Sequence, residues 1–220
     1  MMNDLDPDLF KAVAPFLWDG LLTSFGLLLL AMAGGGLLGT ILAVMRIAGS
    51  RPIAAIAAGY VNGLRSVPLI MVIFWFYLLV PLVIGRPIGA FTSALIAFVI
   101  FEAAYYAEII RAGIQSVPKQ QLAAALASGL GPFQAYRFVV LPQAIRKMLP
   151  ILLSQSIALF QDTSLVYVVG LHDFMTAISV TANREGHLVD FYLFAVLVYF
   201  TLCFAASQSI QFLNRSPVSP

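Results

Sequence analysis

The sequence predicts an all-α integral membrane protein with about five transmembrane helices. Of its 220 residues, 61% are hydrophobic and only 10% are charged, whereas soluble domains contain roughly 25% charged residues. Several apolar stretches also reach the length of about 20 residues that a helix needs to cross a bilayer. A net charge of +2 is too small to indicate nucleic-acid binding. A single membrane domain over residues 1–220 therefore accounts for the whole chain.

Five apolar stretches define the expected spans. They cover approximately residues 16–45, 53–84, 88–110, 149–171 and 191–213. Arg65 interrupts the second, and Glu102 and Glu108 lie near the end of the third. The fourth contains Asp162. The N-terminal segment MMNDLDPDLF is acidic where a signal peptide needs positive charge, so we expect no cleavable signal.

The distribution of basic residues predicts the orientation, because Lys and Arg are enriched in cytoplasmic loops. If the N-terminus is outside, eight basic residues lie on the inner side: Arg46, Arg51, Arg111, Lys119, Arg137, Arg146, Lys147 and Arg215. Three lie outside: Lys11, Arg86 and Arg184. We therefore expect an external N-terminus and a cytoplasmic C-terminus.

Small residues recur at intervals of four in the first span. Ala31, Gly35, Gly39 and Ala43 share one helix face, which lets another backbone approach closely. This pattern favours helix packing over a role in lining a pore.

The long inner loop, about residues 114–148, is too weakly apolar to span. Residues 119–128 are rich in the helix formers Ala, Leu and Gln, and Gly129 should end that helix. A second short helix is expected over about residues 133–140, ending before Leu141-Pro142. Such a hairpin could lie on the lipid headgroups or dock a soluble partner, and the spacing alone leaves both open.

This loop resembles the signature of ABC-importer permeases, which reads EAA, three residues, Gly, nine residues, Ile, one residue, Leu-Pro. Gly129 matches the glycine, Val139 the isoleucine position and Leu141-Pro142 the closing pair. The phrases YAEIIRAGIQSVPK, LPQAIRKMLP and QDTSL resemble the polar amino-acid subfamily. Within it, FEAAYYAEIIRAGIQSVP and LFQDTSLVYV look most like a glutamate/aspartate permease, and the similarity covers most of the chain.

One position departs from the signature, because its glutamate falls on Ala123. The literal EAA string at residues 102–104 lies in the third span at the wrong distance from Gly129, and we treat it as a coincidence. A second, similar permease subunit could carry the missing carboxylate. The resemblance assigns to the ATPase-coupling loop Gln121, Ala123, Ala124, Ala125, Gly129, Val139, Leu141 and Pro142.

The resemblance implies the fold of an ABC type I importer permease in a bacterial inner membrane. It also implies three partners: a dimeric ABC ATPase, a second permease subunit that is homologous or identical, and a periplasmic solute-binding protein. The sequence has no G-x-x-x-x-G-K-[ST] loop, so we expect ATP to be used by the partner and no cofactor to be bound by this chain. The substrate would be an amino acid, and the subunit itself would not be an enzyme.

Polar residues within the fourth span are candidates for the substrate path. A carboxylate at the bilayer centre costs about 2.5–3.5 kcal/mol, so Asp162 should face protein or water. With Thr163 and Ser164 it would form a polar site at a helix interruption; the alternative is that Asp162 only caps the break through backbone amides. Gln155 lies two turns earlier on the same face, and a neutral side chain there suits an acidic substrate.

Arg65 has two interpretations. Its guanidinium could bind a substrate carboxylate, or it could extend to the inner membrane interface. Glu108 and Arg111 are three residues apart and could pair on one helix face, for which we favour a structural role over a proton relay.

Two other function classes compete with an importer subunit. In an ion-coupled secondary transporter of a small polar solute, Asp162 and Glu102 would be coupling sites, but such a carrier needs no docking hairpin. An intramembrane enzyme is disfavoured because no catalytic constellation lies at a suitable depth. His172-Asp173 and His187 should be solvated in the outer loop; they lack zinc-ligand spacing, and no metal site is predicted.

Overall fold

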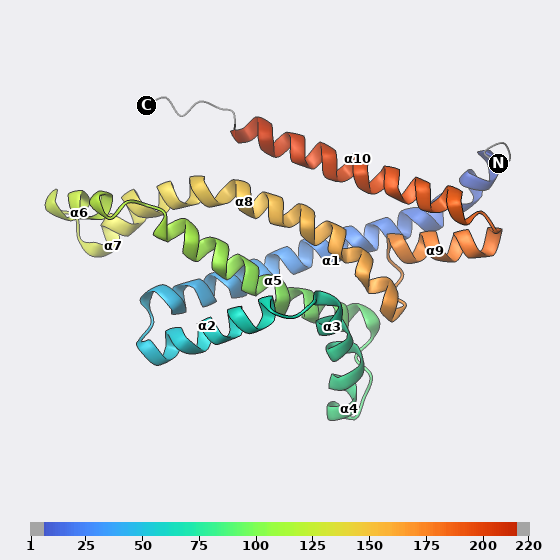
Figure 1. Ribbon diagram of the computed structural model, residues 1–220, viewed down its shortest axis with the longest axis horizontal. Coiled ribbons are helices and arrows are strands. Elements are labelled where there is room, and N and C mark those ends of the chain that lie inside the picture. Colours follow the sequence, from blue (N-terminus) through green and yellow to red (C-terminus); the bar gives the residue numbers. More distant parts are fainter. Residues whose placement is uncertain (1–6, 215–220) are drawn as a thin grey trace. The chain divides into compact units, whose positions relative to one another are not determined.

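The computed structural model describes residues 7–214, and every regular element among them is helical (Figure 1). The α-helices are α1 (Pro7–Ala48), α2 (Arg51–Arg65), α3 (Leu69–Phe74), α4 (Val80–Ile84), α5 (Ala90–Gln115), α6 (Lys119–Ala127), α7 (Pro132–Ala135), α8 (Leu141–Asp162), α9 (Phe174–Glu185) and α10 (Leu188–Asn214). Two π-turns, η1 (Trp75–Leu79) and η2 (Tyr136–Val140), and a 3₁₀ segment, η3 (Thr163–Val169), join some of them. The predicted all-α class is confirmed.

Four continuous helical segments are long and apolar enough to cross a bilayer. They are Leu9–Ala48, Ala90–Gln115, Pro132–Val169 and Leu188–Phe212. The pair Arg51–Arg65 and Leu69–Ile84, separated by a short break, makes a fifth if it is counted as one span. Each predicted span overlaps one of these segments. Arg215, which enters the predicted orientation, lies outside the described residues, as do the first six residues of the acidic N-terminal segment.

The chain divides into two compact units. The first comprises residues 1–32, 68–98 and 156–220, and the second comprises residues 33–67 and 99–155. The chain passes between them within α1, α5 and α8 and at the break between α2 and α3. Each unit has its own core.

The core of the first unit is built by α1, α9 and α10 around side chains that include Leu17, Ile178 and Phe191. The sequence did not predict α9, and the expectation that Asp173 is solvated was wrong. Asp173 is fully buried and begins α9 by accepting hydrogen bonds from the backbone nitrogens of Met175 and Thr176, both at 3.0 Å. Burial raises the pKa of its carboxyl, and these hydrogen bonds lower it in part. A capped helix with one apolar face can pack where a solvated loop was expected.

The core of the second unit lies where α1 meets α5 and α2. Ala43, at the end of the small-residue stripe, is fully buried. A Cβ atom at Gly35 would lie 2.9 Å from the Cβ of Glu102, and one at Gly39 would lie 2.7 Å from the Cβ of Tyr106. The predicted packing role of these glycines is confirmed, because only residues without side chains allow this approach.

Candidate functional site

The first half of the inner loop folds as predicted. Helix α6, Lys119–Ala127, matches the expected helix over residues 119–128. Gly129 ends it with a φ of +86°, a conformation that glycine adopts without steric cost, and the backbone nitrogen of Leu130 donates to the carbonyl of Ala125 at 3.3 Å.

The second half corrects a prediction. The expected helix over residues 133–140 does not end before Leu141-Pro142, because α7, η2 and α8 run on without interruption from Pro132 to Asp162. A π-turn precedes the proline, and such a turn rearranges the local hydrogen bonds that a proline ring would otherwise disrupt. The side-chain amide of Gln143 donates to the backbone carbonyl of Val139 at 2.9 Å, which gives that carbonyl a hydrogen-bond partner. The second half of the inner loop is therefore the first part of the long helical segment that continues as α8.

Side-chain contacts fix this loop to the helices on either side. Val117, Val140 and Ala144 form a small buried cluster, against which Ile114 and Leu122 pack. The ammonium of Lys147 on α8 donates to the carbonyl of Ser116 at 2.8 Å, and the amide of Gln143 contacts the Oε1 atom of Gln121 at 3.4 Å. A force on α6 would therefore be transmitted to both α5 and α8.

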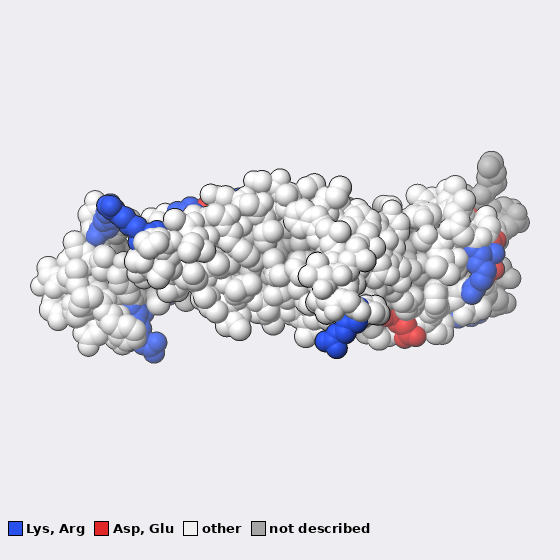
Figure 2. Space-filling model, turned by 90° about the horizontal axis from the view of Figure 1, so that it is seen from below, with Lys and Arg blue, Asp and Glu red and all other residues white. Residues whose placement is uncertain are grey.

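The loop presents an apolar surface without a partner among the described residues. Of the residues assigned to coupling, those that are exposed are Gln121, Ala123, Ala124, Gly129, Leu141 and Pro142. Ala125 is buried and Val139 is half-buried. Three larger apolar side chains lie beside them: Leu126 is 42% exposed, Phe133 78% and Phe138 62%. Phe133 was not among the predicted coupling residues, although an aromatic residue directly after a Gly-Pro break is a recognisable signal. Figure 2 shows Lys and Arg side chains in the region of α6 and α7.

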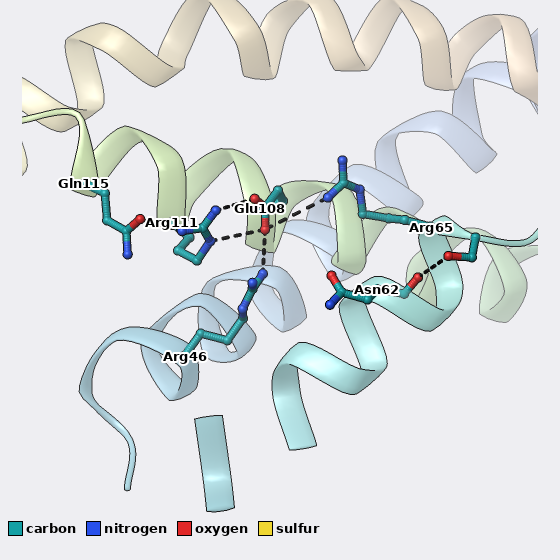
Figure 3. Close-up of polar contacts among 7 residues, drawn as sticks. Arg46, Asn62, Arg65, Glu108, Arg111 and Gln115 are labelled. Carbon is teal, nitrogen blue, oxygen red and sulfur yellow. Dashed lines mark hydrogen bonds and ion pairs between the residues drawn. The ribbon is translucent and has the colours of Figure 1, made fainter. Parts of the chain in front are cut away.

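A cluster of charged side chains lies at the base of the loop (Figure 3). The carboxylate of Glu108 on α5 contacts an Arg46 Nη atom at 2.5 Å, and Arg111 binds both of its oxygens. Arg65, at the end of α2, lies 4.0 Å from the same carboxylate and stacks over the ring of Tyr105 at 5.4 Å. The predicted pairing of Glu108 and Arg111 is confirmed. Within this cluster, three guanidinium groups share one carboxylate.

A second polar pair lies between α8 and α5. The side-chain amide of Gln155 donates to both carboxylate oxygens of Glu102, at 3.2 and 3.1 Å, and Glu102 is fully buried. This pair was not predicted, because Glu102 was interpreted as part of a chance EAA string. The available signal was that two polar residues in separate apolar spans each need a buried partner.

The residues Asp162, Thr163 and Ser164 lie in the first unit, whereas Arg65 and Gln155 lie in the second. The predicted interruption is present, because α8 ends at Asp162 and continues as the 3₁₀ segment η3. The Asp162 side chain makes no capping hydrogen bond there, which rules out the capping alternative. Thr163 is fully buried, and its hydroxyl donates to the carbonyl of Phe160 at 2.7 Å.

Comparison with known sequences shows which family this chain belongs to. Residues 35–217 match the family described as binding-protein-dependent transport system inner membrane component. The chain is 47% identical over 208 residues to the glutamate/aspartate import permease protein GltK of Escherichia coli O6:H1, covering 91% of this chain and 93% of that protein. It is 35% identical over 186 residues to the probable glutamine ABC transporter permease protein GlnM of Bacillus subtilis, covering 84% and 86%.

Comparison with solved structures leads to the same family. The chain matches the crystal structure of an amino acid ABC transporter with histidines at a TM-score of 0.90 and 30% identity, covering 97% of this chain and 99% of that one. The inward-facing MetNI methionine ABC transporter, at a TM-score of 0.71 and 20% identity, shares the fold. The predicted permease resemblance and type I importer fold are confirmed, and this chain belongs to the binding-protein-dependent transport system inner membrane component family, the multi-pass permeases of ABC importers.

Proposed function

We propose that this chain is one permease subunit of an ATP-driven importer of glutamate and aspartate. The 47% identity to a permease named for these substrates supports the choice of acidic amino acids. The subunit forms part of the translocation path and catalyses no covalent step. ATP is hydrolysed by a separate ABC ATPase dimer, since the sequence contains no phosphate-binding loop of its own.

The observation that carries this proposal is the inner loop. Its exposed side chains Leu126, Phe133 and Phe138 offer an apolar contact surface, and its attachments to α5 and α8 provide a rigid connection to the spans. A groove on the ATPase receives this surface, and the closure of the ATPase dimer shifts the permease between outward- and inward-facing states. A partner can drive only the state that it binds better, so tight attachment of the loop is a requirement.

The remaining partners follow from the family. A second permease subunit, identical or homologous, completes the path, and a periplasmic solute-binding protein delivers the amino acid. The N-terminus lies outside and the C-terminus in the cytoplasm, in keeping with the eight basic residues of the inner segments. An ion-coupled carrier is disfavoured because it would have no use for the docking loop.

The substrate path includes polar residues of the spans and of their ends. In the second unit these are Arg65 and Gln155, together with Glu102, which Gln155 binds. In the first unit they are Asp162, Thr163 and Ser164 at the start of η3. The neutral Gln155 amide hydrogen-bonds the buried Glu102 carboxyl without adding a carboxylate of its own, which suits the passage of an anionic amino acid.

A cysteine at Ala124 tests the coupling role. In a Cys203→Ser background, Ala124→Cys should cross-link to the co-purified ATPase and should resist a membrane-impermeant maleimide in intact cells. Val189→Cys, exposed next to the expected outer loop, is the matched control and should be labelled from outside. Labelling of position 124 from outside would overturn the proposal.

A further inference from the structure

We propose that the second unit binds an anionic phospholipid of the inner leaflet in a cavity at the foot of the inner loop. The cavity has a volume of about 580 Å³, which lies in the range of roughly 300–1,000 Å³ typical of ligand sites. It lies between the end of α1, the end of α5, α6 and η2. Its assignment to the cytoplasmic leaflet rests on the proposed function.

The lining is suited to a hydrocarbon chain. Six of the nine lining residues carry apolar side chains: Ile47, Ile114, Val117, Pro118, Leu122 and Val140. The three polar residues of the lining, Gln115, Lys119 and Tyr136, leave most of the wall apolar. In a membrane protein the abundant apolar molecule is lipid, so an acyl chain is the natural occupant.

The surroundings of the cavity are positively charged. Lys119 lines it directly. Gln115, a second lining residue, accepts a hydrogen bond from Arg111 at 2.5 Å, which connects the cavity to the arginine cluster in Figure 3. Lys147 donates a hydrogen bond to the carbonyl of Ser116, whose neighbours in the chain, Gln115 and Val117, both line the cavity.

This positive charge is not balanced within the unit. Residues 33–67 and 99–155 contain eight Lys and Arg but only two acidic residues. Glu108 is shared among three arginines, and Glu102 is buried against Gln155. An apolar cavity bordered by uncompensated cations matches an anionic amphiphile, whereas a free phosphate would use only the cations and a neutral lipid only the apolar wall. The occupant is therefore an anionic phospholipid, with its phosphate near Lys119 and one chain in the cavity.

The test measures bound lipid on the purified permease–ATPase complex by native mass spectrometry, after delipidation and titration with dioleoyl phosphatidylglycerol or dioleoyl phosphatidylcholine. The complex without substitutions should bind phosphatidylglycerol more tightly than phosphatidylcholine. Lys119→Gln should weaken its binding about five-fold, the contribution expected of one cation near anionic lipid. Ile47→Trp, which fills the cavity without changing charge, should also reduce it. Arg146→Gln is the matched control, because Arg146 is exposed on α8 but does not line the cavity.

Three results would overturn the proposal: equal retention of the two lipids, unchanged phosphatidylglycerol binding in both Lys119→Gln and Ile47→Trp, or retention only after the ATPase is removed. The last would mean that the ATPase covers the cavity. Thermal unfolding of each variant in detergent identifies any that fail to fold, and Lys119→Gln, an exposed substitution, keeps the test decisive if Ile47→Trp does not. The readout is lipid mass rather than transport, so a failed cross-link at position 124 would contradict the proposed function without changing the lipid result.

Discussion

Gln155 on α8 and Glu102 on α5, 53 residues apart in the chain, are joined by two hydrogen bonds of 3.2 and 3.1 Å. Glu102 is fully buried, and both of its carboxyl oxygens accept from the same Gln155 amide nitrogen. A hydrogen bond matters most where water is absent, because a buried polar group that loses its partner cannot turn to solvent. This pair therefore connects two spans through a buried polar contact.

Replacing Gln155 by Leu should lower the free energy of unfolding by about 1–3 kcal/mol, the cost of removing the hydrogen-bond donor of a buried polar group. Gln155→Glu should additionally lower glutamate uptake, since it places a second carboxylate against Glu102. Unfolding in mixed micelles and uptake in proteoliposomes measure the two effects. The control is Gln161→Leu, exposed on the same helix, and an uptake rate unaffected by Gln155→Glu would contradict the path assignment.

Gly39→Ala should destabilise the protein by about 1–3 kcal/mol, the usual cost of overpacking. The added methyl group would lie 2.7 Å from the Cβ of Tyr106 and 2.9 Å from the carbonyl oxygen of Ala103, so α1 and α5 must separate. Gly36→Ala is the matched control, because its Cβ would meet nothing within 4 Å. It should be neutral or stabilise the helix by up to about 1 kcal/mol. Equal melting temperatures for the two variants would exclude close packing at position 39.

Glu108→Gln should cost about 2 kcal/mol, because it leaves Arg46 and Arg111 facing a neutral amide. The value is below the roughly 3–5 kcal/mol found for fully buried pairs, since these side chains are 14–24% exposed. Arg65→Gln should cost less than about 1 kcal/mol, since Arg65 lies 4.0 Å away and is 38% exposed. High salt should partly rescue Glu108→Gln by screening the arginines from one another.

Unfolding measured at low and high salt tests this cluster. The control is Glu185→Gln, which removes an exposed pair with Arg184 and should change little. A larger loss from Arg65→Gln than from Glu108→Gln would show that the carboxylate is not the centre of the cluster.

Phe133→Ala should leave the stability of the permease unchanged and weaken its association with the ATPase about ten-fold. The side chain is 78% exposed, so its removal costs little packing within the chain, whereas large apolar anchors often dominate an interface. Phe200→Ala, exposed to 62% on α10, is the control and should not alter association. Titration of purified ATPase onto the reconstituted permease measures the affinity, and equal values for both variants would remove Phe133 from the docking surface.

Local sequence signals predicted much of this architecture. Long apolar runs indicated the spans, and the Ala-rich segment before Gly129 indicated α6 almost to the residue, because helix propensity and a glycine terminator act over a few neighbouring positions. Failures arose where neighbours distant in the chain decide. Asp173 reads as a solvated loop residue until α1 covers it, and Leu141-Pro142 reads as a helix end until a π-turn accommodates the proline.

Amino-acid order alone identified a helical membrane protein, the short helix α6 of the inner loop and the family, since hydrophobic length and a continuous motif need no knowledge of distant contacts. It also predicted the Glu108–Arg111 pair, whose members are three residues apart on one helix. Tertiary structure decided the pairing of Gln155 with Glu102, the convergence of Arg46 and Arg65 on Glu108, and the cavity beneath α6. These features depend on which faces of separate helices meet, and each face is selected by packing across the bundle rather than by its own segment.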